Sequence, residues 1–224
     1  MPARARGLSG ARSIGARPRS RGARARGDEP AVSRALAPAL ALFLFACLAP
    51  RPPAEPRYFS PRGDAAAVET PARETRTGAE LRLRRVVASD HLRYRMVWRR
   101  GVEVGFHDLW RWTQPPASYA EARLARELFE LRGLRRATRP DAASLAVSLV
   151  AFDEVLEPDH EALVVLDVIL VDRAQVSLLD RTFTARRPVG GGDPEEVARA
   201  LGEALSDAAG EVGAAVEIAL VTPP

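Results

Sequence analysis

Lysine is absent from this chain of 224 residues, so all 33 basic residues are arginine. Cysteine occurs only once, as Cys47, which excludes an internal disulfide framework and a zinc site built from several cysteines. Aromatic residues make up only 6% of the sequence, but 46% of it is hydrophobic. That share is enough for a buried core and excludes a wholly disordered chain.

Acidic residues are scarce near the N-terminus. Residues 1–34 hold nine arginines against Asp28 and Glu29, whereas the rest of the chain holds 24 arginines against 27 acidic residues. The net charge of +4 would ordinarily favour nucleic-acid binding. Because the body of the protein is mildly acidic, we predict no nucleic-acid partner. Residues 1–34 also lack apolar periodicity, so we expect them not to fold.

An apolar run over residues 35–46 precedes the cysteine. It is shorter than the roughly 20 residues of a membrane span, but it fits the core of a secretory signal peptide. Leu44, Phe45, Ala46 and Cys47 resemble a bacterial lipobox, which predicts signal-peptidase recognition at the first three and lipidation of Cys47. Leu48 stands where an inner-membrane retention signal would place Asp, which favours the periplasmic face of the outer membrane. The alternative is that Cys47 is an ordinary apolar residue of a buried helix.

The sequence predicts three regions. Residues 1–46 form a signal peptide with an over-long leader, whose true start is either Met1 or near Val32. Residues 47–78 form the lipidated cysteine and a Pro-rich tether, with a short strand near 58–60. Residues 79–224 form a single α/β domain, a mixed sheet of about five or six strands with two main helices packed on it.

Within this domain, alternation of apolar residues predicts a strand over 81–88 and a hairpin of 92–100 and 102–111. Ser118 and Glu121 form a capping-box pattern that predicts a helix ending near Gly133. Three strands follow, over 145–155, 163–171 and 176–186, the second of them apolar enough to be buried on both faces. Asp193 as N-cap, Pro194 at the first helical position and Glu196 in a second capping box begin the last helix.

Few residues are candidates for catalysis, metal binding or phosphate binding. His91, His107 and His160 lack the spacing of a metal-binding helix, so we expect exposed or edge-strand histidines. The sequence has no nucleophile-elbow motif. The glycines at 190–192 lack the lysine of a phosphate loop and are followed by acids. We therefore predict no catalytic residues, no metal and no cofactor.

Arginines and aromatic residues alternate in the hairpin, next to the basic cluster Arg82, Arg84 and Arg85. One interpretation is a surface that contacts a partner, formed by Arg93, Tyr94, Arg95, Trp98, Trp110 and Trp112. The alternative interpretation is a solvated strand face in a protein in which arginine takes the place of every lysine. Trp112 fits the core better, since it precedes a Pro-Pro step that must be packed.

The chain resembles the ABC-type transport auxiliary lipoproteins, the PqiC-like family. The resemblance is carried by segments spread over residues 58–220: Tyr58-Phe59-Ser60, the arginine-rich hairpin with Trp112-Thr-Gln-Pro115-Pro116, the strands 145–155 and 163–171, Asp180-Arg181-Thr182-Phe183, Pro188-Val189 and the helix from Asp193. The insert over 62–78 departs from the family pattern.

This resemblance implies an outer-membrane lipoprotein that assists an MCE-type ABC system in transporting lipids or hydrophobic solutes, without enzymatic activity. Its implied partners are an MCE-domain protein, a permease and an ATPase, and a homo-oligomer is left open. Two alternatives remain. One is a lipoprotein of outer-membrane assembly, serving a lipopolysaccharide or protein translocon. The other is a periplasmic hydrolase using Asp167, Asp172 or His107.

Overall fold

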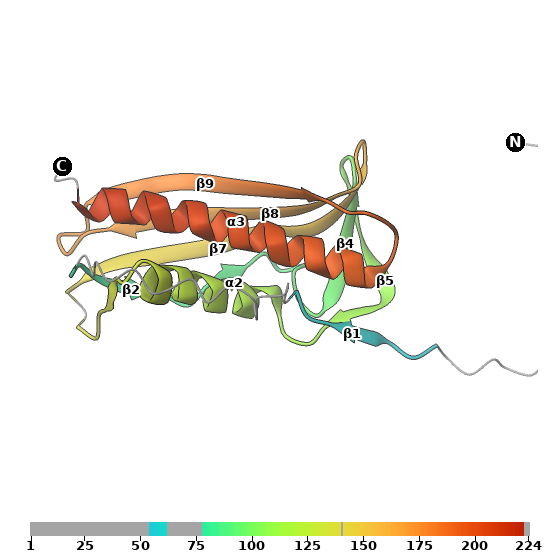
Figure 1. Ribbon diagram of the computed structural model, residues 1–224, viewed down its shortest axis with the longest axis horizontal. Coiled ribbons are helices and arrows are strands. Elements are labelled where there is room, and N and C mark those ends of the chain that lie inside the picture. Colours follow the sequence, from blue (N-terminus) through green and yellow to red (C-terminus); the bar gives the residue numbers. More distant parts are fainter. Residues whose placement is uncertain (1–53, 62–77, 140, 222–224) are drawn as a thin grey trace, which may run out of the picture. The chain divides into compact units, whose positions relative to one another are not determined.

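A computed structural model describes residues 54–61, 78–139 and 141–221. The leader, Cys47 and most of the insert after the first strand lie outside these residues. The described part is a mixed α/β domain in which two helices pack on one sheet, as predicted (Figure 1). No helix in these ranges combines the length and apolar composition needed to cross a bilayer.

The sheet contains nine strands in the described ranges, more than the five or six expected, because three of them are only two or three residues long. The segment 81–88 forms two strands rather than one. The hairpin and the three later strands are present as predicted. The strands are β1 (Arg57–Phe59), β2 (Glu80–Leu83), β3 (Val87–Ala88), β4 (Arg95–Arg100), β5 (Glu103–Trp112), β6 (Arg135–Arg136), β7 (Ala143–Glu157), β8 (Glu161–Val171) and β9 (Ser177–Pro188).

Strand β7 is the centre of the sheet. On one side it pairs along its length with antiparallel β8, which in turn pairs with antiparallel β9. On its other side, its first half pairs with parallel β2 and β3 and its second half with parallel β4. Strand β4 continues into antiparallel β5, and the end of β5 pairs with parallel β1. The hairpin is therefore attached to the domain through the second half of β7.

The first helix, α2 (Pro116–Ala125), begins after Pro115 without a side-chain cap, so the predicted capping box is wrong. Glu121 instead accepts a hydrogen bond from the backbone N–H of Val86 at 3.1 Å, which ties the helix to the segment before β3. The helix continues as one π-helical segment, η1 (Arg126–Leu131). Gly133, with φ of +67°, ends it where the sequence predicts.

The second helix, α3 (Pro194–Val221), begins as the sequence predicts. The Asp193 carboxylate accepts a hydrogen bond from the N–H of Glu195 at 2.9 Å. Glu196 does not complete a capping box in the described residues; its carboxylate lies against Gly191. The apolar stripe of this helix is buried against β8 and β9, at Val197, Ala200, Leu201, Ala204, Leu205, Ala208 and Val212.

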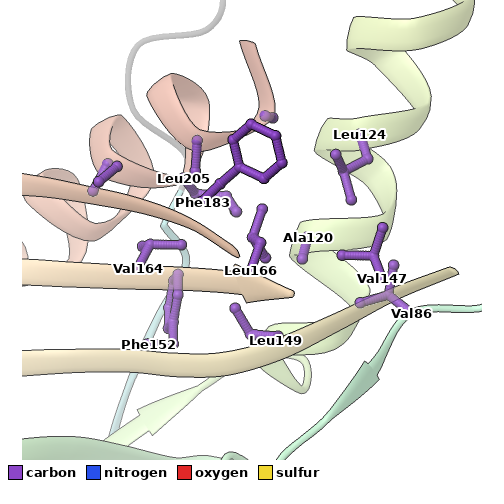
Figure 2. Close-up of a cluster of buried hydrophobic side chains, with 14 of the residues drawn as sticks. Val86, Ala120, Leu124, Val147, Leu149, Phe152, Val164, Leu166, Phe183 and Leu205 are labelled. Atoms are coloured by element: carbon purple, nitrogen blue, oxygen red, sulfur yellow. The ribbon is translucent and has the colours of Figure 1, made fainter. Parts of the chain in front are cut away.

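The core lies between the sheet and the two helices (Figure 2). Its aromatic members include Trp112 of β5, Phe152 of β7 and Phe183 of β9. Leu124 of α2 and Leu205 of α3 belong to the same core. Strand β8 is buried on both faces only in its first half, because Ile169 in its second half is 45% exposed. The expectation of a strand buried throughout is therefore wrong for that half.

Arg132 joins η1 to α3 by three hydrogen bonds. Its guanidinium donates to Glu127 at 3.0 Å, to Glu217 at 2.8 Å and to the carbonyl of Gly210 at 3.1 Å. Gly213 is needed beneath it, because a Cβ there would lie 2.8 Å from the Glu127 side chain. Glu127 is buried, and Arg132 is the cation that faces its carboxylate.

We expect Arg132→Met to lower the free energy of unfolding by about 2–4 kcal/mol, because it leaves the Glu127 carboxylate buried without its cation. Urea unfolding of the purified protein measures this. The matched control is Arg126→Met, whose partner Glu130 lies 4.0 Å away at the surface, and it should cost less than about 0.5 kcal/mol. Equal losses for the two variants would contradict the role given to Arg132.

Candidate functional site

The predicted lipidation and recognition residues, Leu44, Phe45, Ala46 and Cys47, lie outside the described residues. The candidate site that the structure does describe is the β4–β5 hairpin with the end of β7 behind it. Its turn is formed by Gly101, with φ of +57°, and by the fully exposed Val102. The other predicted contact residues all lie in or next to this hairpin.

Trp98 lies flat against the hairpin. It pairs with Gly105 across the two strands, and a Cβ on Gly105 would overlap the indole ring. The guanidinium of Arg100 lies 6.0 Å from the centre of the indole. Glycine is therefore required opposite Trp98, and the ring is only partly available to a partner.

Strand β5 is irregular over residues 107–110. Arg95 pairs with Arg111, but Val97 pairs with Phe106, so extra residues of β5 lie between the two pairs. The side chain of Arg111 holds this bulge by donating hydrogen bonds to the carbonyls of His107 and Trp110, both at 3.0 Å, and of Asp108 at 2.8 Å. As a result the rings of His107 and Trp110 stack, with centroids 3.8 Å apart and planes 18° apart.

Two histidines bracket one buried carboxylate at the base of the hairpin. Glu154 of β7 is only 3% exposed. Its Oε2 lies 2.6 Å from Nε2 of His107 on β5, and its Oε1 lies 2.7 Å from Nε2 of His160, just before β8. Burial acts to raise the pKa of Glu154, but hydrogen bonds and charge from the two histidines outweigh it, and the pKa lies below its ordinary value.

His107 lies on an edge strand, as expected, because β1 pairs only with the end of β5. The expectation missed that His107 and His160 are both partly buried and hydrogen-bonded to Glu154. Their partner is 47 residues from one and 6 from the other, so no local spacing rule identifies the cluster. The available signal was Glu154 itself, a carboxylate within an apolar strand, which must find partners when buried. The third histidine, His91, lies in the turn before β4.

A second buried carboxylate faces the other side of the sheet. Asp153 is fully buried and accepts two hydrogen bonds from Arg99 of β4, at 3.0 and 2.8 Å. Around it lies a small apolar cluster of Ala151, Val155 and Leu163. The hairpin is thus tied to β7 by a buried carboxylate on each face of the sheet, and Arg100 adds an exposed ion pair with Glu157 at 3.1 Å.

The remaining contact candidates separate into exposed and buried residues. Tyr94 is 53% exposed, and the side chain of Arg93 is exposed beside it. Arg95 lies over the ring of Phe106 and forms an ion pair with Asp108 at 3.1 Å. Trp112, by contrast, is 1% exposed and packs edge-on against Phe152, so it belongs to the core and is not a contact residue.

The residues considered for a hydrolase are not brought together. Asp167 accepts a hydrogen bond from Thr182 at 2.6 Å, and Asp172 accepts two from the backbone of its own turn. His107 is engaged by Glu154. In the described ranges, neither His107 nor His160 is hydrogen-bonded to a hydroxyl or thiol, and no group of three or more His, Cys, Asp or Glu residues is arranged to hold a metal ion.

Comparison with known proteins gives one family. A family model for the "ABC-type transport auxiliary lipoprotein component" matches residues 63–213. Among solved structures, a Xanthomonas campestris protein is 19% identical with a TM-score of 0.63, over 73% of this chain and 96% of its own. A second, uncharacterized protein is 14% identical with a TM-score of 0.56, over 73% and 99% of the two chains. At these identities the two structures show the fold alone. No curated protein matches the chain.

The bracketed carboxylate leads to a pH-dependent prediction. Glu154→Gln should lower the free energy of unfolding at neutral pH by about 1–3 kcal/mol, since the amide cannot accept from both imidazoles as the carboxylate does. The carboxylate stabilises the fold above the ordinary carboxyl pKa of 4.5, and this contribution is lost as the pH falls through the lowered pKa of the folded state. The difference between wild type and variant should therefore narrow below pH 4.5.

Urea unfolding at neutral and acidic pH measures this difference. Asp167→Asn removes an exposed carboxylate from the neighbouring strand and is the control, expected to change the free energy by less than about 0.5 kcal/mol. If the difference in the free energy of unfolding between wild type and Glu154→Gln stays constant as the pH falls, the charge of Glu154 does not stabilise the fold.

Proposed function

The chain belongs to the family of ABC-type transport auxiliary lipoprotein components, and we propose that it is a non-enzymatic accessory of an MCE-type ABC transport system for lipids or hydrophobic solutes. The observation that carries this proposal is the family match over residues 63–213. The described residues support it, since they contain a rigid hairpin with exposed cationic and aromatic side chains and no paired nucleophile and base. The proposed partners are an MCE-domain protein, a permease and an ATPase.

The proposed location is the periplasmic face of the outer membrane. The apolar run 35–46 ends at the lipobox, and lipidation of Cys47 attaches several acyl chains, which meets the requirement of more than one chain for stable anchoring. The Pro-rich segment between Cys47 and β1 then separates the domain from the membrane. Leu48 in place of Asp supports export to the outer membrane.

Two substitutions test the anchor. Cys47→Ala should abolish incorporation of a labelled fatty acid, because no other cysteine is present to accept the lipid. Leu48→Asp should still incorporate label but should move the protein to the inner-membrane fraction of a sucrose gradient. Equal labelling of wild type and Cys47→Ala would remove the anchor from the proposal, and an unchanged location of Leu48→Asp would remove the outer-membrane assignment.

The proposed partner contact is the exposed part of the hairpin, Arg93, Tyr94 and Arg95, together with the accessible edges of Trp98 and Trp110. Arginine and aromatic residues carry much of the binding energy in protein interfaces. The contacts of Asp153 with Arg99 and of Glu154 with His107 fix the hairpin on β7, and His107 in turn stacks on Trp110. Less ordering of the hairpin is therefore needed on binding. Trp112 is excluded from the contact because it is buried.

Pull-down of the full-length protein from detergent-solubilised envelopes tests this contact. Arg93→Glu combined with Tyr94→Ala should reduce recovery of transporter subunits at least about tenfold, corresponding to about 1.4 kcal/mol of binding energy. The control combines Arg173→Glu with Val176→Ala, an exposed arginine and an exposed apolar residue in the turn between β8 and β9. It should bind as wild type does.

The identity of the captured proteins decides between the proposal and its rivals. Recovery of an MCE-domain protein with its permease and ATPase supports the proposal. Recovery of a lipopolysaccharide or protein translocon instead would favour a lipoprotein of outer-membrane assembly. Turnover of ester or phosphate substrates that disappears in His107→Ala would contradict the non-enzymatic role.

A further inference from the structure

A cluster of arginines at β2 takes no part in the hairpin or in the core contacts. The segment 81–89 contains Arg82, Arg84 and Arg85 and no acidic residue. In the described ranges, none of these three side chains forms an ion pair or a hydrogen bond, and the buried Nε of Arg82 has no acceptor. We refer to the three side chains as the arginine edge.

The acidic residues around the arginine edge are occupied by other groups. Glu80, which precedes it, pairs with Arg135 at 2.9 Å and with Arg139 at 3.5 Å. Asp90, which follows it, pairs with an arginine of the next turn. Glu121 of α2 accepts a backbone N–H. The described residues therefore leave the positive charge of the arginine edge available to an anionic partner.

Two of the three arginines lie on the face of the sheet that the helices do not cover, the helix-free face. Leu81 and Leu83 pack in the core beneath the helices, so alternation along β2 turns Arg82 to the opposite face. The ladder continues at Arg84, whose N–H donates to the carbonyl of Leu145 at 2.9 Å. The same alternation places Arg84 on the helix-free face.

An exposed valine follows on this face. Val87 is 58% exposed and pairs with Ser148 of β7. Its neighbour Ala88 packs against the core, so Val87 points to the helix-free face. Guanidinium groups beside an exposed apolar side chain suit the surface of an anionic bilayer, where phosphate groups lie above acyl chains.

The segment between Cys47 and β1 keeps the domain close to a leaflet when Cys47 is lipidated. Arg57, the first residue of β1, is the tenth residue after Cys47. Ten residues span at most about 36 Å when fully extended. Strand β7 alone has 15 residues and is about 50 Å long. Since the domain is longer than its connection, it stays beside the leaflet, and its surface charges determine which side faces the headgroups.

We propose that the arginine edge binds anionic phospholipid headgroups of the leaflet that holds Cys47. This inference rests on the lipid anchor of the proposed function and adds a second contact with the same leaflet. A planar guanidinium donates two hydrogen bonds to a phosphate, and each arginine near an anionic surface adds to the attraction. Strand β2 and the hairpin lie along different halves of β7 (Figure 1), so the hairpin stays free for the transport partner.

A fluorescent label beside the arginine edge tests this contact. Val87→Cys places the label on the helix-free face, and Ile218→Cys, at a position 66% exposed on α3, places it on the helical side as the control. Cys47 is the only native cysteine and is acylated, so only the introduced thiol reacts. Each protein, purified with its lipid, is reconstituted into vesicles whose headgroups carry a nitroxide quencher. The vesicles contain phosphatidylcholine alone or mixed with phosphatidylglycerol.

The label at Val87→Cys should be quenched at least about threefold more in the mixed vesicles than in phosphatidylcholine, because the anionic headgroups attract the arginines. High salt should abolish this difference, since it screens exposed charges. The label at Ile218→Cys should be quenched equally in both kinds of vesicle. Equal quenching of Val87→Cys in the two kinds, or a difference that high salt leaves unchanged, overturns the proposal.

Substitution of the exposed arginines gives a second test in the same assay. In the Val87→Cys protein, Arg84→Gln combined with Arg85→Gln should lower the quenching in mixed vesicles to the level in phosphatidylcholine. The matched control, Arg181→Gln combined with Arg199→Gln, removes two exposed arginines from β9 and α3 and should leave the quenching unchanged. Equal effects of the two double substitutions would contradict a specific role of the arginine edge.

Uptake of labelled fatty acid by the same proteins separates this proposal from the proposed function. A protein that is not acylated removes the anchor, and with it the leaflet contact. An acylated protein whose label at Val87→Cys stays unquenched in mixed vesicles overturns the leaflet contact alone. Capture of an acidic envelope protein that is lost in Arg84→Gln with Arg85→Gln would then identify a different occupant of the arginine edge.

Discussion

The buried carboxylate of Glu154 fixes the position of the β4–β5 hairpin, and the exposed surface of that hairpin depends on it. An anion removed from water is tolerated only when its oxygens are satisfied, and here one imidazole satisfies each oxygen. One of these, His107, stacks on Trp110, so the carboxylate also determines where that aromatic ring lies. On the opposite face, the buried carboxylate of Asp153 accepts two hydrogen bonds from Arg99 and so also fixes the hairpin. The hairpin is therefore a rigid part of the sheet at its base.

Elements with strong local signals were predictable from the sequence. Asp193 and Pro194 begin α3 as expected, because the N-cap hydrogen bond involves only neighbouring residues. The alternation in the hairpin and in the later strands also gave the correct strands. The capping box of Ser118 and Glu121 failed because Glu121 is used by a backbone N–H 35 residues away. A capping box involves only neighbouring residues, whereas the hydrogen bond that Glu121 accepts comes from a segment far away in the sequence.

The histidine cluster could not be predicted for a related reason. Its geometry depends on the register of β5 against β4 and β7, and on a bulge that places His107 and Trp110 on one face. Alternation along a regular strand puts residues three apart on opposite faces. What the sequence did contain was a pair of consecutive acids, Asp153 and Glu154, inside an apolar strand. Two such residues in a buried strand imply two sets of polar partners, one for each face.

In this fold, several arginines make contacts that a lysine could not make. Arg99, Arg111 and Arg132 each donate two or three hydrogen bonds to carboxylates or carbonyls held at fixed positions. A planar guanidinium fits such sets of acceptors, whereas an ammonium group is a point charge on a flexible stem. These arginines are occupied within the molecule and are not available to a partner. The basic surface is consequently smaller than the composition indicates, and at the hairpin it centres on Arg93 beside Tyr94.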